Sequence, residues 1–394
     1  MTETHLPHSP DTDLFSIPPV SWVMLACLPK FGVRRRQAVR EATAELTDIL
    51  ALNPATLRAM ALPPETVAGV QAWQARDLGH PVLARVAAIV RDCQRLGVDL
   101  MCWQDPDYPE ALRHIHDAPL VLYTLGDRSL LGQKQIAVVG SRHASRDGLA
   151  HARAFAAALS ERELLVTSGL ALGVDGAAHA GALDAGYPTI AVIGSGLDRI
   201  YPGQHRELAQ RIAGQGLLVS EYPPGTPARP GHFPRRNRVI SGLSCGVLVV
   251  EAGLKSGSLI TARLALEQGR DVFAIPGSVH NPLARGCHHL IRQGACLVES
   301  ADDIVAELGG WCAPPAVSAE ASPAAQEPVQ QALDLSALDD REIAVFEALG
   351  YDPQSTDALS SATGLPADQL MQSLLLLELQ GLVMSVPGGF QRVT

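Results

Sequence analysis

The stretch that decides the fold is Gln135–His179, QIAVVGSRHASRDGLAHARAFAAALSERELLVTSGLALGVDGAAH. It opens with an apolar run over Gln135–Val139, continues through a helical pattern over Arg146–Arg162, and returns to a second apolar run over Leu164–Thr167. Strands that are apolar on both faces and are separated by a helix predict a parallel sheet covered by helices on both sides. Each strand is followed by glycine and other small residues, which predicts tight turns at one edge of the sheet.

The same alternation extends through the middle of the chain. Further strands are predicted at Asp99–Trp103, Leu120–Thr124, Thr189–Ile193, Leu217–Ser220, Val247–Val250, Asp271–Ile275 and Ala295–Val298. Further helices are predicted at Val174–Ala185, His205–Ala213, Ser258–Gln268 and Leu283–Arg292. We therefore expect an α/β fold in which residues 80–310 form an extended Rossmann-like domain with a parallel-sheet core.

The flanking segments differ in composition from this core. Residues 1–19 are polar and contain prolines, which predicts a flexible tail, and residues 20–79 read as short helices of a small SAM-like or helix-hairpin-helix-like domain. Residues 311–335 are rich in Ala, Pro and Glu, a composition typical of a linker. Residues 336–394 predict helices followed by a strand pair that turns at 387–389, which is the winged-helix pattern.

The composition of the chain argues against a membrane protein and against a disulfide-bonded protein. The chain has 394 residues, 47% of them hydrophobic, and no apolar run reaches the roughly 18 residues that a membrane span needs. Its seven cysteines are scattered without a CxxC pair, which favours a reducing cytosol over disulfides. The net charge of -10 is concentrated in residues 313–394, where eleven acids face two arginines. The rest of the chain is nearly neutral, so a basic surface for nucleic acid remains compatible with the overall acidity.

Four predicted strands end in turns of small residues that open helices: Val139–Arg142, Ser168–Gly173, Ile193–Gly196 and Lys255–Thr261. In an open parallel sheet such turns gather at the carboxyl edge, where helix N-terminal N–H groups favour phosphate. None of these turns is a dinucleotide fingerprint, and the chain has no GxSxG, no HExxH and no P-loop motif. We expect a phosphate-binding edge without a recognisable catalytic set, without a cofactor and without a metal.

Two smaller clusters contain residue types that catalyse reactions or bind metals. Asp175 and His179 lie one helical turn apart. They could form an acid–base pair, but we expect them instead to tie the start of the helix to a neighbouring loop. The second cluster is Cys287, His288 and His289, with Cys296 nearby as a further possible metal ligand. We expect these side chains to pack in the core or to cap helices, and not to bind a metal.

The segment Gly231–Arg238, GHFPRRNR, places an aromatic ring among arginines. Cations that follow a phosphate backbone, with an aromatic ring on which a base stacks, are what a single-strand binder requires. The alternative interpretation is a solvated charged loop. Among its arginines we expect Arg238 to be the most buried, because it leads into the following helix.

These motifs together resemble the DprA/Smf family, the DNA-processing protein A of natural transformation. The resemblance is carried by GSRHAS, SGLALGVDGAAH, AVIGSGLDRIYP, SEYPPG, FPRRNRVISGLS, VVEAGLKSGSLITARLALEQGRDVFAIPG and GCHHLIRQGA, from Trp103 to Ala295. It implies a cytoplasmic, homodimeric protein that is not an enzyme. Such a protein protects incoming single-stranded DNA and loads the RecA recombinase on it, even against single-strand-binding protein.

The resemblance also implies a set of DNA-binding residues: Gly140, Ser141, Arg142, Ser168, Gly169, His232, Phe233, Arg235, Arg236, Asn237, Arg238 and Lys255. Two departures limit it. Leu172 stands where some relatives have Arg, and Arg229-Pro230 stands where some have Lys.

Two other functions fit parts of the chain. The first is a nucleotide-cleaving hydrolase on a lysine-decarboxylase-like sheet, but the stretch from Glu251 to Thr261 lacks the catalytic Glu of its PGGxGTxxE motif. The second is a winged-helix transcription factor, but the helix expected to read a groove, Pro366–Leu379, has no Lys or Arg. Its many leucines exceed what a small core must bury, which predicts that part of its surface serves protein contacts.

Overall fold

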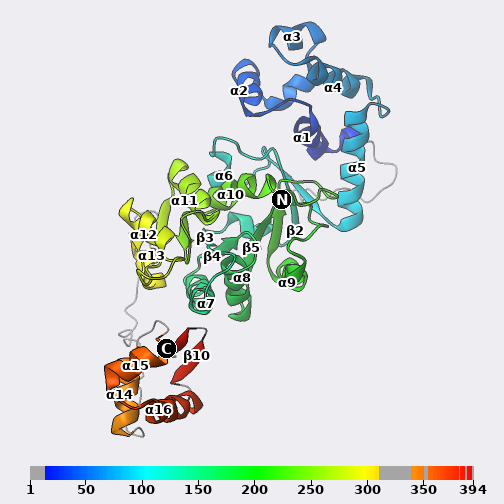
Figure 1. The fold of residues 1–394 in the computed structure, drawn as a ribbon. Helices are drawn as coiled ribbons and strands as arrows, with labels where there is room; N and C mark the ends of the chain where they lie inside the picture. The colour runs from blue at the N-terminus through cyan, green and yellow to red at the C-terminus, as the bar shows by residue number, and fades with distance from the viewer. Residues whose placement is uncertain (1–13, 310–338, 350–353, 381, 387, 393–394) are drawn as a thin grey trace, which may run out of the picture. The chain divides into compact units, whose positions relative to one another are not determined.

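The computed structural model describes residues 14–309, 339–349, 354–380, 382–386 and 388–392. The chain divides into two compact units, Met1–Ala313 and Pro314–Thr394, and each is described by itself (Figure 1). The expected linker, residues 311–335, lies outside the described residues, as do the first thirteen residues of the expected tail.

A nine-stranded sheet forms the centre of the first unit, in the order β1-β2-β6-β5-β4-β3-β7-β8-β9. Its strands are β1 (Asp99–Cys102), β2 (Val121–Gly126), β3 (Gln135–Val139), β4 (Leu165–Ser168), β5 (Thr189–Ile193), β6 (Leu217–Ser220), β7 (Gly246–Val249), β8 (Asp271–Ala274) and β9 (Cys296–Leu297). The predicted parallel core is confirmed, with β2 as the exception because it runs antiparallel to both β1 and β6. Between β1 and β2 the chain contains one short helix, α6 (Glu110–Arg113).

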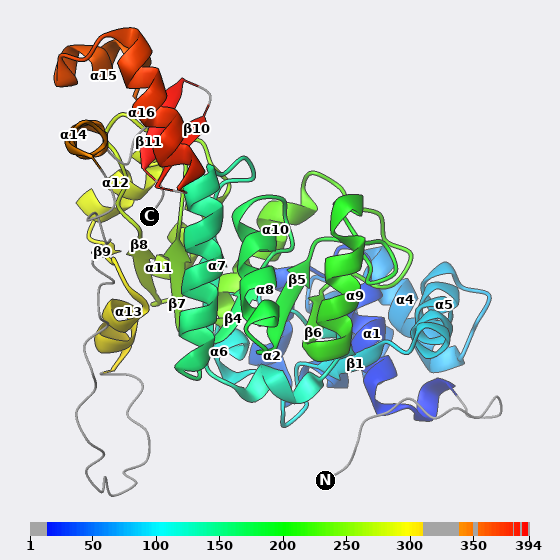
Figure 2. The same ribbon diagram turned by 90° about the horizontal axis from the view of Figure 1, so that it is seen from below.

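Helices cover both faces of this sheet (Figure 2). On one face Ile136 and Val138 of β3 pack with α7 (Arg146–Glu161), α8 (Val174–Asp184) and α13 (Ala301–Leu308). On the other face Ala137 and Val139 of β3 pack among residues of α10 (His232–Leu243), α11 (Ser258–Glu267) and α12 (Arg285–Arg292). Alternate residues of one apolar strand thus serve two separate cores, as the period of a strand requires.

The N-terminal helices are α1 (Pro18–Cys27), α2 (Val33–Ala42), α3 (Pro54–Ala59), α4 (Pro64–Ala75) and α5 (Pro81–Leu96). Their apolar residues share one hydrophobic cluster with residues of β1 and β2 and with α9 (Arg206–Gln215). The predicted boundary near residue 80 therefore does not separate two hydrophobic cores. The N-terminal helices and the sheet bury their apolar faces against each other.

The predicted tail of residues 1–19 extends too far into the fold. A short 3-10 helix spans Leu14–Ser16, Ile17 is buried, and α1 begins at Pro18. A proline is suited to the first turn of a helix, where its missing N–H group needs no partner.

Helix α10 is the largest difference from the sequence-based prediction. Residues 232–238 were interpreted as a basic segment in front of a helix, whereas they form the first two turns of α10 itself. The proline in HFPRRN suggests that no helix has begun there. Pro234 lies in the first turn of α10, however, where a helix tolerates proline.

The second unit is a winged helix, as predicted. It contains α14 (Asp340–Ala348), α15 (Thr356–Thr363), α16 (Ala367–Leu379) and the hairpin of β10 (Val383–Val386) with β11 (Gly389–Arg392). Leu370, Leu374 and Leu377 of α16 are buried, while Leu375 and Leu379 are 56% and 77% exposed. The prediction that this helix has more apolar surface than its core buries is confirmed. None of the helices in the described part of the chain combines the length and the apolar character that a membrane-crossing segment requires.

The close packing of α7 against α8 requires a glycine at position 181, which a stability measurement can test. A Cβ atom on Gly181 of α8 would collide with the backbone of Arg153 in α7, and backbone cannot move aside as a flexible side chain can. Gly181→Ala should therefore destabilise the protein by ~1–3 kcal/mol, the usual cost of overpacking. Gly214 in α9 has open space around its Cβ position, so Gly214→Ala should be neutral or stabilising. Urea unfolding of both variants is the measurement, and equal midpoints would contradict this account of the α7–α8 contact.

Candidate nucleic-acid interface

A cavity of about 660 Å³ opens where the turns after β3, β4 and β7 meet the N-terminal half of α10. Many residues expected from the sequence to bind DNA line it together: Gly140, Ser141, Arg142, Phe233, Arg236, Asn237 and Lys255. They come from three separate segments of the chain: the turn after β3, helix α10 and the turn after β7, which pairs with β3 in parallel. Of the four small-residue turns expected at this edge, those after β3, β4 and β7 contribute to the lining, and Ile193–Gly196 does not.

Two glycines allow these turns to come so close. A Cβ atom on Gly140 would lie 2.6 Å from a methyl group of Val174 and 2.9 Å from the carbonyl oxygen of Glu251. Gly173, at the start of α8, has a φ of +78°, and a Cβ atom there would collide with the backbone of Ser141. The N–H of Ser141 donates to the Glu251 carbonyl at 2.7 Å, so the turns after β3 and β7 are joined directly.

An exposed cation and two aromatic rings lie next to one another in the lining. The guanidinium carbon of Arg142 lies 5.6 Å from the ring centroid of Phe233. The Phe233 ring in turn lies 5.5 Å from that of Tyr201, at an interplanar angle of 43°. Tyr201 is 54% exposed. Sequence reasoning missed Tyr201, although its position directly behind the glycine-rich turn that follows β5 is a signal that could have found it.

Arg236 forms the inner wall of the cavity. It is 5% exposed, and its Nη1 donates to the carbonyl oxygens of Gly169 and Val192, at the ends of β4 and β5. Burial lowers the pKa of its guanidinium to about 10, and the neighbouring Asp175 acts in the opposite direction. The group is still protonated at neutral pH, so it adds a positive charge to the wall. Its Nη1 donates to backbone, and its Nε donates to Oδ1 of Asn237.

Asp175 and His179 serve the anchoring role that we expected. Oδ2 of Asp175 accepts from the N–H groups of Gly169 and Ala171, at 3.2 and 3.4 Å. Nδ1 of His179 lies 2.8 Å from Oγ1 of Thr189, and burial lowers the pKa of this imidazole to about 3. A neutral, fully buried histidine that bonds to a neighbouring strand does not form an acid–base pair with Asp175.

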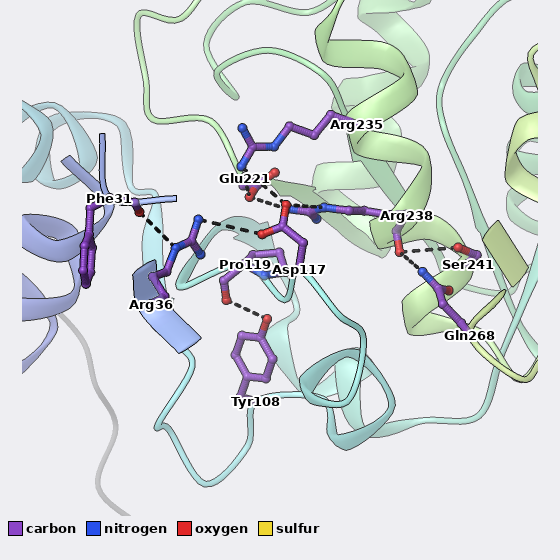
Figure 3. Close-up of polar contacts among 10 residues, drawn as sticks. All are labelled: Phe31, Arg36, Tyr108, Asp117, Pro119, Glu221, Arg235, Arg238, Ser241 and Gln268. Carbon is purple, nitrogen blue, oxygen red and sulfur yellow. Dashed lines mark hydrogen bonds and ion pairs between the residues drawn. The ribbon is translucent and has the colours of Figure 1, made fainter. Parts of the chain in front are cut away.

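Arg235 and Arg238 lie on a different side of α10 from Arg236 and are absent from the lining of the cavity. Figure 3 shows both reaching toward two acids, Glu221 after β6 and Asp117 in the segment before β2. Nη2 of Arg238 donates to Glu221 Oε1 at 2.6 Å, and Nη2 of Arg235 lies 3.3 Å from the same oxygen. Arg36 of α2 joins the group through Asp117, at 3.7 Å.

The expectation that Arg238 is the most buried arginine of the segment is wrong. Arg238 is 8% exposed and Arg236 is 5% exposed. Both side chains are buried because their partners come from other strands, which the local sequence, free of acids, does not reveal.

The remaining expected residues lie beside the cavity. Ser168 is fully buried, and its Oγ donates to the Val138 carbonyl at 2.6 Å. Gly169 faces the Arg236 guanidinium, which occupies the place that a Cβ atom would take. The His232 ring stacks on Tyr222, with centroids 4.1 Å apart and an interplanar angle of 15°.

The described residues contain no group of three His, Cys, Asp or Glu side chains arranged to hold a metal ion. Cys287 is buried, and its thiol donates to carbonyl oxygens of Val249 and Val250. Nε2 of His288 lies 2.9 Å from the Gly277 carbonyl oxygen. These contacts fit the core and capping roles that we expected.

Comparison with protein-family models gives two matches. Residues 99–309 match the model of DNA recombination-mediator protein A, and residues 313–389 match that of the DprA winged helix domain. The first match contains the whole sheet and every residue that lines the cavity.

Individual relatives agree with these models. The chain is 42% identical over 290 residues to Protein Smf of Escherichia coli, covering 73% of this chain and 75% of that protein. It is 50% identical over 204 residues to the DNA processing protein DprA of Streptococcus pneumoniae, covering 52% and 72%. The X-ray structure of the Streptococcus pneumoniae protein covers 75% of this chain and 98% of its own, with a TM-score of 0.62 and 37% identity. The chain therefore belongs to the family of DNA recombination-mediator protein A, which includes the DprA and Smf proteins.

Proposed function

We propose that this protein binds single-stranded DNA in the cavity at the carboxyl edge of the sheet and acts as a mediator of recombination. The observation that carries the proposal is the combination of accessible cations and rings in one place. Arg142 and Lys255 are exposed cations in the lining, and Phe233 with Tyr201 offers aromatic surface beside them. Cations neutralise phosphates, and every base has a face that stacks on a ring.

The geometry favours a single strand over a duplex. An aromatic ring can stack on a base only when that base is unpaired or displaced from the helical stack. The winged helix does not supply a second route to duplex DNA, since α16 contains no Lys or Arg and has Asp368 in its first turn. Groove readers depend on cations at that position.

We propose that the cavity binds the DNA strand and does not hydrolyse it. Among the described residues that line the cavity, Asp175 is the sole carboxylate. Its Oδ2 is engaged with two backbone N–H groups and its neighbour is the Arg236 guanidinium, so it holds the turn in place. This carboxylate is therefore not free to face a substrate as a general base would.

Membership of the recombination-mediator family supports a finer proposal. The protein would act as a homodimer that protects incoming single strands during natural transformation, displaces single-strand-binding protein and loads the RecA recombinase. An assay of RecA-dependent strand exchange on strands already covered by single-strand-binding protein tests it. Addition of this protein should start exchange that RecA alone does not start, and no change in the rate would contradict the proposal.

The first prediction concerns preference and salt. The protein should bind oligothymidylate more tightly than blunt duplex of equal length, because a ring stacks on a base only when that base is unpaired. It should show little sequence selectivity among single strands, because rings and phosphate ligands read no base edges. The logarithm of its affinity should fall linearly with log salt, with a slope of roughly −0.7 for each phosphate neutralised. Fluorescence anisotropy titrations at several salt concentrations measure both, and equal affinity for the duplex would exclude the proposal.

The second prediction concerns Arg142. Arg142→Ala should weaken single-strand binding about tenfold, ~1.4 kcal/mol, close to the lower end of what a hydrogen bond to a charged group contributes, and should make the salt slope shallower. Arg142→Lys should retain part of the affinity. Arg263→Ala, which removes another exposed arginine outside the cavity, is the matched control and should bind normally. A large loss of thermal stability in Arg142→Ala would show instead that Arg142 is structural.

The third prediction concerns Phe233. Phe233→Ala should cost ~1–3 kcal/mol of binding free energy through the loss of base stacking. Phe233→Trp should restore binding, whereas Phe233→Leu keeps apolar bulk and should not. Anisotropy titrations decide the matter, and normal binding by Phe233→Leu would show that only the volume of the side chain is needed.

The fourth prediction concerns the winged helix. Truncation after Trp311 removes a unit with a net charge of -9, to which phosphates are not attracted. The truncated protein should bind single strands within about threefold of the full chain. A loss of tenfold or more, ~1.4 kcal/mol, with dimerisation intact would assign the winged helix a direct part in DNA binding.

A further inference from the structure

A second cavity of about 570 Å³ lies between helix α5 and the segment that leads from β6 to α10. Arg85, Ile89 and Asp92 of α5 form one wall, and Tyr222, Arg229 and His232 belong to the other. Both walls are part of the first compact unit, in which α5 packs into the same hydrophobic cluster as the sheet. The N-terminal helices therefore contribute directly to this cavity.

The two cavities meet at the first turn of α10. His232 lines the second cavity and Phe233, the next residue, lines the first. Nδ1 of His232 lies 3.1 Å from the carbonyl oxygen of Gly194, and a Cβ atom on that same glycine would lie 3.2 Å from the Phe233 ring. Consecutive residues of this turn therefore belong to the linings of the two cavities.

The second cavity repeats the chemistry of the first. Tyr222 and His232 form a stacked pair of flat rings, with centroids 4.1 Å apart and planes 15° from parallel. No described residue forms a hydrogen bond or ion pair with Arg85 or Arg229. Asp92 is the sole acid among the described residues of the lining, and it is paired with Arg95 at 2.9 Å. The cavity thus has two available cations and an aromatic pair, while its one acid is neutralised.

We propose that this second cavity is a further nucleotide subsite, which holds the continuation of the DNA strand bound in the first. The Tyr222–His232 pair stacks on a base, and Arg85 and Arg229 contact the flanking phosphates. Helix α5 then has a binding role in addition to its packing role. This inference rests on the proposed function, because the strand must first occupy the cavity beside Arg142.

The experiment measures affinity as a function of strand length. Oligothymidylates from about 4 to about 16 nucleotides cover the usual range of single-strand site sizes. Arg85→Glu should bind the shortest strand as the unaltered protein does and should lose about tenfold in affinity for the longest. Arg91→Glu is the matched control, since it introduces the same charge change at an exposed arginine of the same helix outside the cavity. It should bind strands of every length normally.

A second variant tests the aromatic pair. Tyr222→Ala should lower affinity for long strands only, and Tyr222→Trp should restore it. Thermal unfolding of every variant shows whether it is still folded. Arg85 is exposed, so Arg85→Glu should not disturb folding. If Tyr222→Ala is unstable, the affinities of Arg85→Glu for short and long strands test the subsite instead.

Two results would overturn the inference. The first is an equal effect of Arg85→Glu and Arg91→Glu at all lengths, which would show a general charge effect. The second is an equal loss by Arg85→Glu for short and long strands. Arg142→Ala separates these failures from failure of the proposed function: if it still weakens binding, only the second subsite is wrong. If the unaltered protein shows no preference for single strands, the proposed function fails, and the subsite that rests on it fails too.

Discussion

The buried guanidinium of Arg236 is the contact on which the candidate site depends. It joins α10 to the carbonyl oxygens at the ends of β4 and β5, and Asp175 of α8 lies beside it. A charge taken out of water is tolerated only with such partners, and loss of one partner leaves the other uncompensated. This group therefore fixes the position of α10, and with it the position of Phe233 over the edge of the sheet.

Helix α10 presents different chemistry on its different sides. Phe233 and Arg236 face the cavity, whereas Arg235 and Arg238 turn toward Glu221 and are paired there (Figure 3). A basic segment in a sequence is thus not equivalent to a basic binding surface, since acids from distant segments can neutralise part of it. The available cations of the candidate interface come instead from turns such as that of Arg142, whose side chain forms no ion pair with an acid in the described part of the chain.

Local sequence patterns predicted most of the sheet, because a strand buried on both faces must be apolar throughout. The bounds of Gln135–Val139 and Thr189–Ile193 agree with the structure to the residue. The start of α10 was not predicted, because Pro234 and a run of arginines give a loop-like composition to a segment that joins the hydrophobic core only from Val239 onward. Tyr201 was missed for a related reason: its partner ring, Phe233, lies far away in the chain.

The sequence by itself determined the α/β class, the winged helix and the small-residue turns, since each depends on the period of apolar residues or on the space that a Cβ atom needs. It also indicated Arg142, Phe233 and Lys255 as side chains of the proposed strand-binding cavity, although not Tyr201. Only the tertiary structure decided which of those side chains are available. Strand order brings Glu221 to Arg238 and two carbonyl oxygens to Arg236, while Arg142 and Arg85 are left exposed. Pairing between charges depends on distance in space, and no local pattern in the sequence encodes that distance.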